Sequence, residues 1–256
     1  MRPQEGEKGV VRSSPTSQVD APRARVPEGT RIYAIGDIHG RLDLLDEVLA
    51  RVEADTAMHP ASNAINVFLG DYVDRGPDSK RVLERLISCC VAQPTVCLMG
   101  NHEAFLREFL NNPDILSTWR RYGGLDTLLS YGLTPTMKTE AQERRKLASD
   151  LNRLLPSSHR EFLSSLKRYF ICGDFFFVHA GVRPGISLTE QSEDDLLWIR
   201  DDFLECKNDF GKVIVHGHTP VLEPDVRSNR INIDTGAYAT GRLTCLVLEN
   251  HEVRFI

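Results

Sequence analysis

Short apolar runs alternate with amphipathic segments in the first hundred residues, and each run is closed by a glycine. Residues 32–35, 65–69 and 95–99 are mostly apolar and are followed by glycine, which predicts strands that are buried on both faces. Residues 41–52 and 78–87 carry apolar side chains at helical spacing. This strand–helix alternation predicts a parallel sheet with right-handed crossovers.

The pattern changes in the second half of the chain. Residues 104–167 are predicted to be mostly helical, as an insertion. Short strands are predicted after it, at residues 169–172, 175–179, 212–216, 230–233 and 243–248. Strands that follow early strand–helix units predict a second sheet packed on the first.

The N-terminal segment differs from the rest. Residues 1–29 are rich in Pro, Ser and Gly and contain few apolar side chains, which predicts a disordered tail. A basic regulatory arm is the alternative, but five Arg and Lys stand against four Asp and Glu there. Residues 30–256 are expected to form one domain.

Composition narrows the class of protein. The net charge of −5 argues against the basic face that broad nucleic-acid binding needs. No apolar run reaches the roughly 20 residues that cross a membrane, and no hydrophobic signal segment begins the chain. The six cysteines form no CxxC pair and are expected to be reduced thiols. A cytoplasmic protein is therefore expected.

Polar residues that could bind a metal follow each of the first three predicted strands. Asp37 and His39 follow the first, Asp71 follows the second, and Asn101 and His102 follow the third. Parallel strands end at one edge of a sheet, so these side chains should converge. Converging carboxylates and imidazoles need a positive charge between them. Mixed oxygen and nitrogen ligands suit Mn, Fe or Zn.

Two late strands end in histidines as well. His179 closes one, and His216 and His218 close another. Each cluster alone would more often be a capped turn or a buried core histidine. Five such clusters at strand ends in one chain favour a metal site.

The clusters also form an ordered set of motifs. In chain order they are GDIHG, GDYVDRG, GNHE, HAG and GHTP. This set resembles the PPP-type metallophosphatases of the calcineurin-like metallophosphoesterase superfamily, in the bacterial serine/threonine protein phosphatase branch, over about residues 32–248. The resemblance implies an α/β fold: a β-sandwich of two mixed sheets flanked by helices.

The resemblance also implies a dinuclear metal centre. It implies two divalent metal ions, Mn in the first place, with Fe or Zn as alternatives. Asp37 and His39 would bind one ion and Asp71 would bridge both. The other ion would be completed by Asn101, His179 and His218. His218 is preferred to His216 because the family's ligand directly follows glycine.

The same resemblance implies roles for four further residues. His102 resembles the general acid, and Asp74 would hold its ring. Arg75 and Arg200 resemble a pair of phosphate-binding arginines; for Arg200 the alternative is a surface ion pair with Asp201 or Asp202. A hydroxide that bridges the metals would attack phosphorus directly, and His102 would protonate the leaving oxygen.

The substrate is less well determined by the motifs. The expected activity is hydrolysis of phosphoserine and phosphothreonine in proteins or peptides, with phosphotyrosine as a further substrate. The alternative is a symmetrical bis(5'-nucleosyl)-tetraphosphatase, a branch that typically has Ala where this chain has Asp74 and Asp where it has Glu103. A non-catalytic binding scaffold is disfavoured because every expected ligand is present. Tyr238 would either touch substrate or pack in its loop. A monomer that binds neither nucleic acid nor membrane is expected.

Overall fold

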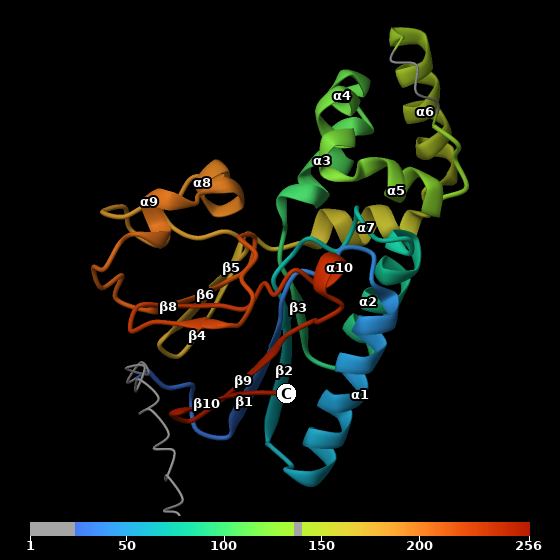
Figure 1. Cartoon of the computed structure of the whole chain (residues 1–256). Helices are drawn as coiled ribbons and strands as arrows, with labels where there is room; N and C mark the ends of the chain where they lie inside the picture. The colour runs from blue at the N-terminus through green and yellow to red at the C-terminus, as the bar shows by residue number, and fades with distance from the viewer. Residues whose placement is uncertain (1–23, 136–139) are drawn as a thin grey trace, which may run out of the picture.

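The body of the protein is a sandwich of two five-stranded sheets (Figure 1). The structure is a computed structural model, which describes residues 24–135 and 140–256. The first sheet has the order β10-β9-β1-β2-β3. β1 is parallel to β2 and β2 to β3, whereas β9 is antiparallel to β1. Its strands are β1 (Thr30–Ile35), β2 (Asn63–Phe68), β3 (Thr95–Cys97), β9 (Cys245–Glu249) and β10 (Glu252–Phe255).

The second sheet has the order β4-β5-β6-β8-β7 and is also mixed. β5, β6 and β8 run parallel, with β4 and β7 antiparallel at the edges. The strands are β4 (Tyr169–Cys172), β5 (Phe175–Val178), β6 (Val213–His216), β7 (Asp225–Val226) and β8 (Arg230–Asn232). The predicted parallel start and the two mixed sheets flanked by helices are confirmed.

Alternate residues of the central strands face two different cores. In β5, Phe175 and Phe177 point into the sandwich, whereas Phe176 and Val178 point to the outer helices. In β1, Ile32 faces the sandwich and Tyr33 faces helices. Because both faces are buried, these strands are continuous apolar runs rather than alternating ones.

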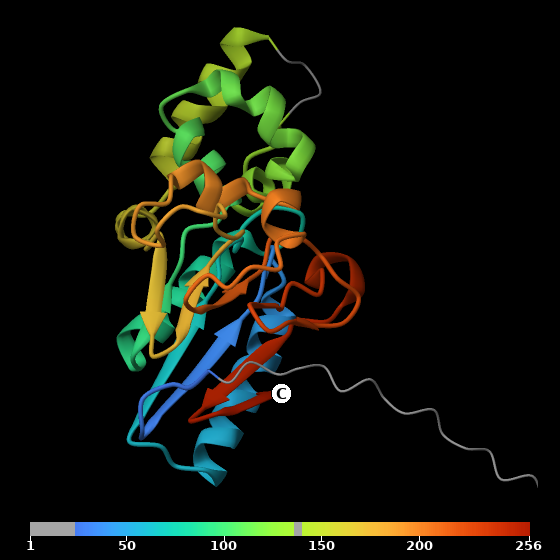
Figure 2. The ribbon, with the colours of Figure 1, turned by 90° about the vertical axis from the view of Figure 1, so that its left-hand side faces the viewer.

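Helices cover the outer face of each sheet (Figure 2). α1 (Leu42–Met58) and α2 (Ser79–Ala92) lie on the first sheet. The short helices α8 (Glu193–Trp198) and α9 (Asp201–Leu204) lie on the second. A last turn, α10 (Ala237–Thr240), follows β8.

The predicted helical insertion stands above the carboxyl end of the first sheet (Figure 1). It begins with α3, whose first residue is the predicted ligand Asn101, so the insertion is joined directly to the strand ends. Its elements are α3 (Asn101–Phe109), η1 (Pro113–Ile115), α4 (Leu116–Trp119), η2 (Arg120–Tyr122), α5 (Gly124–Ser130), α6 (Ala141–Leu154) and α7 (Ser157–Ser165).

Gly124 allows the insertion to close around a buried tryptophan. A Cβ atom on Gly124 would overlap the indole of Trp119, which is fully buried. We expect Gly124→Ala to lower the free energy of unfolding by about 3 kcal/mol through overpacking. Gly132→Ala is the control: its Cβ would meet no atom within 4 Å. There only the positive φ should cost about 1 kcal/mol. Urea unfolding of both variants checks this, and an equal loss would contradict the packing argument.

The predicted disordered tail extends too far. Residues 24–29 pack against the body: Val26 is buried, and its N–H donates to Asn250 O at 3.0 Å. Arg25 N donates to Asp174 Oδ2 at 3.0 Å. Backbone hydrogen bonds with distant loops hold this segment, which local composition does not reveal. The rest of the predicted tail, residues 1–23, lies outside the described residues.

Some strand boundaries also differ from the predicted ones, because hydrogen bonds with distant segments set them. β3 ends at Cys97, two residues before the predicted end, because Met99 N donates to Lys167 O instead of continuing the sheet. β7 and β10 were not predicted, since each is short, only half apolar and pairs only at a sheet edge.

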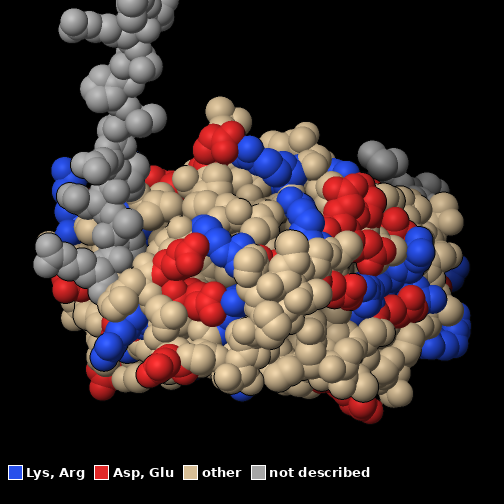
Figure 3. Space-filling view, turned by 90° about the horizontal axis from the view of Figure 1, so that it is seen from below, with Lys and Arg blue, Asp and Glu red and all other residues tan. Residues whose placement is uncertain are grey.

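The end of the molecule opposite the insertion shows Lys and Arg interspersed with Asp and Glu (Figure 3). No field of a single sign therefore forms over that face. Across residues 24–135 and 140–256, no helix is both long enough and apolar enough to cross a membrane.

Candidate active site

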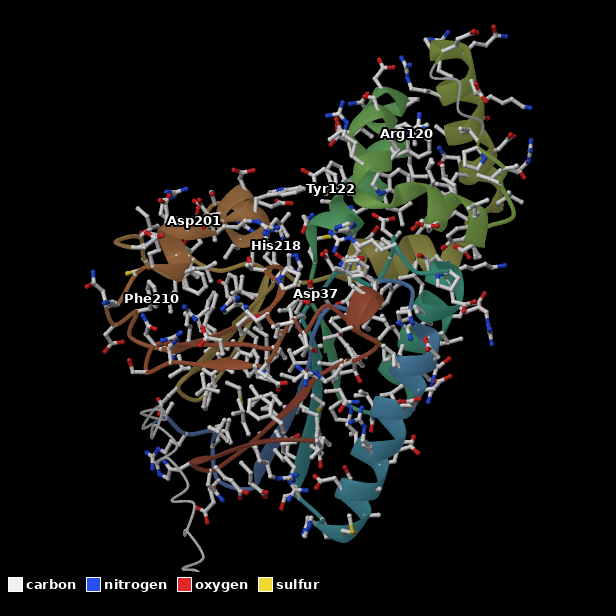
Figure 4. All side chains as sticks on the ribbon, viewed as in Figure 1. Asp37, Arg120, Tyr122, Asp201, Phe210 and His218 are labelled. Carbon is white, nitrogen blue, oxygen red and sulfur yellow. The ribbon has the colours of Figure 1, made fainter. Side chains whose placement is uncertain are left out.

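The predicted metal ligands meet where the strands of both sheets end. Asp37, His39 and Asp71 follow strands of the first sheet, and His179 and His218 follow strands of the second. Figure 4 shows Asp37 and His218 close together between the sheets. The two loops are in contact, because His218 N donates to Asp37 Oδ2 at 3.1 Å. Predicted ligands from five separate motifs thus share one site.

The backbone is strained at this point of the fold. Six non-glycine residues of the described chain have a left-handed φ, and five of them are predicted site residues. Such residues persist only where the surroundings hold them, and they cluster at functional sites. The five are His39, Asp71, Asp74, Arg75 and His218.

Asp71 stands between two groups of possible metal ligands. One group is His39, Asp71 and His102, and the other is Asp71, His179 and His218. The two oxygens of Asp71 are divided between them: Oδ2 lies 3.5 Å from His39 Nε2, and Oδ1 lies 3.3 Å from His179 Nε2. This is the arrangement that a bridging carboxylate requires.

The group around His179 brings lone pairs face to face. His179 Nδ1 lies 3.0 Å from the carbonyl of Leu69, which can only accept, so Nδ1 carries the proton. The bare Nε2 then lies 2.9 Å from Asn101 Oδ1 and 3.2 Å from His218 Nδ1. His218 Nδ1 also lies 2.9 Å from Asn101 Oδ1. A cation between these three atoms would satisfy the facing acceptors.

The group around His39 shows the same feature. His39 Nδ1 lies 2.9 Å from the carbonyl of Val73, so its bare Nε2 faces the Asp71 carboxylate. Asp37 Oδ1 is buried without a hydrogen-bond partner. A side chain on Gly217 would collide with that oxygen, so only glycine lets the loop after β6 approach it. The residues present fit a second cation.

The pKa values of these groups have a common physical cause. Burial and the charges of Asp234 and Asp71 raise the pKa of Asp37 well above its usual range. Burial would also raise the pKa of Asp71, but His179, His102 and His39 together hold it below its usual value. Burial and the neighbouring His179 lower the pKa of His218 to about 2. Neutral imidazoles beside crowded carboxylates are suited to binding divalent cations.

His102 forms a short pair with Asp74. Its Nδ1 lies 2.6 Å from Asp74 Oδ2, and its Nε2 lies 3.7 Å from Asp71 Oδ2. Burial lowers the pKa of His102, but Asp71 and Asp74 outweigh that effect and raise it. His102 can therefore hold a proton beside the metal ligands. Distance alone would also allow it to act as a ligand.

Two arginines lie at the rim. Arg75 Nη2 is 3.3 Å from His102 Nε2, and Arg200 Nη2 is 3.4 Å from the carbonyl of His218. Asp202, one of the surface partners considered for Arg200, pairs with Arg183 at 3.0 Å. Both guanidinium groups are thus placed beside the ligand cluster.

His216 lies apart from the cluster. Its ring is fully buried against Phe203, with centroids 4.9 Å apart, and its Nδ1 is 3.1 Å from Gly217 O. It belongs to neither group of possible ligands. The geometry therefore places His218, and not His216, with the other possible metal ligands.

Sequence reasoning missed the role of Glu103. Its buried carboxylate accepts the backbone N–H groups of Asp71 and Gly100 through Oε2, and those of Tyr72 and Val73 through Oε1. Glu103 thus shapes the loop that carries the bridging aspartate. The signal was present in GNHE, where Glu103 was treated only as a marker of substrate branch.

A further buried carboxylate was also missed. Asp234 follows β8 in the same strand-end position as the predicted ligands, and its charge helps to raise the pKa of Asp37. Its Oδ1 accepts from Gly236 N at 2.9 Å. The predicted strand before it and the glycine two residues after it were the available signals.

Aromatic rings surround the polar centre. The Tyr122 ring lies 6.1 Å from the His102 ring, and the Tyr238 ring lies 5.4 Å from the His39 ring. The guanidinium of Arg75 stacks over Tyr238 at 4.5 Å. Both tyrosines are about two-fifths exposed, at 38% and 40%. Tyr238 therefore packs on site residues and remains partly exposed.

Comparison with known proteins identifies the family of the chain. Residues 30–256 match the family described as calcineurin-like phosphoesterase. The asymmetrical bis(5'-nucleosyl)-tetraphosphatase PrpE of Anoxybacillus flavithermus is 30% identical over 83% of this chain and 88% of its own length. PrpE of Oceanobacillus iheyensis is 26% identical over 84% of this chain and 87% of its own length.

Solved structures share the fold. A protein assigned only provisionally as a diadenosine tetraphosphatase superposes with a TM-score of 0.60 at 20% identity, covering 92% of this chain and 97% of its own. The cold-active protein-tyrosine phosphatase of a psychrophilic Shewanella superposes with a TM-score of 0.57 at 17% identity, covering 95% of this chain and 84% of its own.

Proposed function

Since the chain belongs to the calcineurin-like phosphoesterase family, we propose that it is a metal-dependent hydrolase of dinucleoside tetraphosphates. The observation that carries the reaction class is the sharing of Asp71 between two groups of metal-binding side chains. The PrpE relatives support the substrate, because they match most of this chain and their own length. These relatives are named asymmetrical tetraphosphatases, whereas the alternative that the motifs suggested was a symmetrical tetraphosphatase.

The ligand sets follow from the contacts. Asp37 and His39 would hold one ion, Asp71 would bridge, and the second ion would be held by Asn101, His179 and His218. When bound, two divalent cations would neutralise phosphate charge and make a water molecule more acidic. We propose Mn as the activating ion, with Fe and Zn as the alternatives to compare.

The remaining site residues would act on the phosphate chain or would orient a residue that does. Arg75 and Arg200 would bind phosphate oxygens, since guanidinium groups suit paired anionic oxygens. In its imidazolium form His102 would give the Nε2 proton to the leaving oxygen, and Asp74 would keep the other ring proton on Nδ1. No covalent intermediate with the protein is needed in this scheme.

The rings at the rim suit a nucleotide substrate. Tyr122 and Tyr238 stand on different sides of the His39–His102 pair and are partly exposed. A nucleobase can stack on such a ring whatever its identity. A dinucleoside tetraphosphate offers a base at each end of a polyanion, which matches open rings around a cationic centre.

A second candidate is a phosphoprotein phosphatase for phosphoserine and phosphothreonine, with phosphotyrosine as a further substrate. Asp74 and Glu103 favour it, because both follow the protein phosphatase pattern rather than that of the symmetrical dinucleotide branch. Tyr122 beside His102 would also suit an aromatic leaving group.

A side-by-side rate comparison with Mn present would test the proposal. We expect faster hydrolysis of diadenosine tetraphosphate than of phosphoserine, phosphothreonine or phosphotyrosine peptides, with ATP and AMP as the products. Two molecules of ADP would indicate the symmetrical reaction. Clear preference for the peptides would replace the proposed substrate by the second candidate. Failure to hydrolyse any of them with Mn, Fe or Zn would overturn the activity itself.

A further inference from the structure

The helical insertion reaches into the active site through Asp74, and the reaction scheme above does not use that contact. Asp74 is fully buried. Its Oδ2 accepts from His102 Nδ1 at 2.6 Å and from Trp119 Nε1 at 2.7 Å. Its Oδ1 accepts from Thr127 Oγ1 at 2.5 Å. Both oxygens of the aspartate are therefore held, and two of the three donors come from α4 and α5, beyond the helix that carries His102.

We propose that Trp119 and Thr127 are positioning residues for proton donation by His102. They act through Asp74 and touch neither substrate nor metal ligands. The proposal rests on the role proposed for His102, but not on the choice of dinucleotide or phosphoprotein as substrate. It gives the insertion a part in the chemistry as well as in shaping the cleft.

The contacts restrict how the carboxylate can turn. The bond to Thr127 fixes Oδ1, so Oδ2 must face His102. The indole N–H of Trp119 and the ring N–H of His102 can only donate, which requires Asp74 to be an acceptor at Oδ2. The backbone N–H of Asp74 is held as well, by Thr127 Oγ1 at 2.9 Å and Ser79 Oγ at 3.0 Å. With Asp74 fixed in this way, the Nδ1–H tautomer of His102 is kept and its Nε2 faces the reacting centre.

The insertion carries these donors as one packed unit. Trp119 is fully buried against Phe109, with ring centroids 5.2 Å apart, and Thr127 is fully buried too. Between them, the carbonyl of Gly123 accepts the N–H of Arg75 at 3.3 Å. The segment from Trp119 to Thr127 thus docks on both Asp74 and Arg75, next to the metal ligands.

A purely structural role for these bonds makes a different prediction. Buried polar groups need partners in any protein, so their loss would lower stability. It would then slow all substrates alike. A positioning role slows mainly those substrates whose leaving group needs a proton. Comparing a poor and a good leaving group separates the two roles.

The test measures kcat/KM on phenyl phosphate and on 2,4-dinitrophenyl phosphate with Mn present. For Thr127→Val and Trp119→Phe we expect a loss of about tenfold on phenyl phosphate, the usual size for an outer partner of a site histidine. On the dinitrophenyl ester we expect less than about a twofold change, because that leaving group departs without a proton. Thr127→Ser keeps the hydroxyl and should restore the wild-type ratio. Thr118→Val is the matched control, since Thr118 is exposed on the same helix as Trp119.

A second readout does not depend on activity. The proton of the short His102–Asp74 hydrogen bond should give a downfield ¹H NMR signal, identified by its loss in His102→Asn. The signal should weaken or move in Thr127→Val and Trp119→Phe and stay in place in Thr118→Val. An unchanged signal together with an unchanged ratio of the two rates would overturn the inference. Preference for phosphopeptides over the dinucleotide would overturn the proposed substrate and leave this inference standing.

Discussion

Asp71→Asn is expected to remove most of the activity and much of the bound metal while the fold remains. The two carboxylate oxygens of Asp71 face different ligand groups. Loss of the carboxylate should therefore weaken the binding of both metal ions. We expect kcat/KM to fall by roughly a thousandfold, an order of magnitude beyond the 10–100-fold cost of losing an outer partner of a metal ligand. Metal content per chain, measured by mass spectrometry after gel filtration, should fall in parallel.

The fold should survive because Asn has nearly the same shape and can still accept the N–H of His102, as Asp71 Oδ1 does at 3.2 Å. The circular dichroism spectrum should match that of the wild type. Asp46→Asn is the control: Asp46 is a half-exposed residue of α1 that pairs with Arg85, and its loss should leave rate and metal content unchanged. Full activity or full metal content in Asp71→Asn would refute the dinuclear assignment.

His102→Asn is expected to slow the reaction while the metals stay bound. Removing a positioned proton donor should lower the rate on phenyl phosphate by about a hundredfold to a thousandfold. The effect on 2,4-dinitrophenyl phosphate should be much smaller, because its leaving group needs no proton. Metal content should equal that of the wild type, since His102 is paired with Asp74 through Nδ1 and lies farther from Asp71 than His39 and His179 do.

His251→Asn is a suitable control, because His251 is exposed and lies in the turn between β9 and β10. β9 runs antiparallel to β1, so this turn is at the opposite end of the sheet from the strand ends that carry the site. Loss of metal in His102→Asn would instead make His102 a ligand, which its place among the possible ligands allows. An equal loss of rate on both esters would mean that another group supplies the proton. These outcomes distinguish a role of His102 as general acid from a role as metal ligand.

The convergence of the polar side chains at the strand ends could be predicted because its signals are local. Each of them follows an apolar strand, all but His179 stand next to a glycine, and parallel strands carry such ends to one edge. The pattern therefore placed Asp37, Asp71 and Asn101 together before any contact was known. The resemblance to the family selected His218 over His216, and the structure puts only His218 among the possible ligands.

The residues that support this set could not be found in the same way. Trp119 and Thr127 bond Asp74 across 45 and 53 residues. Nothing in their own neighbourhood marks a tryptophan or a threonine of a helical segment as a partner of an aspartate in another loop. Glu103 was visible in its motif, but its four backbone contacts depend on how the loop after β2 folds over it.

The sequence by itself determined the parallel start of the fold, the two-sided burial of the central strands and the identity of the polar strand ends. These features depend on side-chain periodicity and on glycine, which act over a few residues. Only the tertiary structure decided how residues 24–29 pack, where β3 stops, and how the insertion holds the His102–Asp74 pair. Those features depend on hydrogen bonds between distant segments, whose partners are chosen when the two sheets and the insertion pack together.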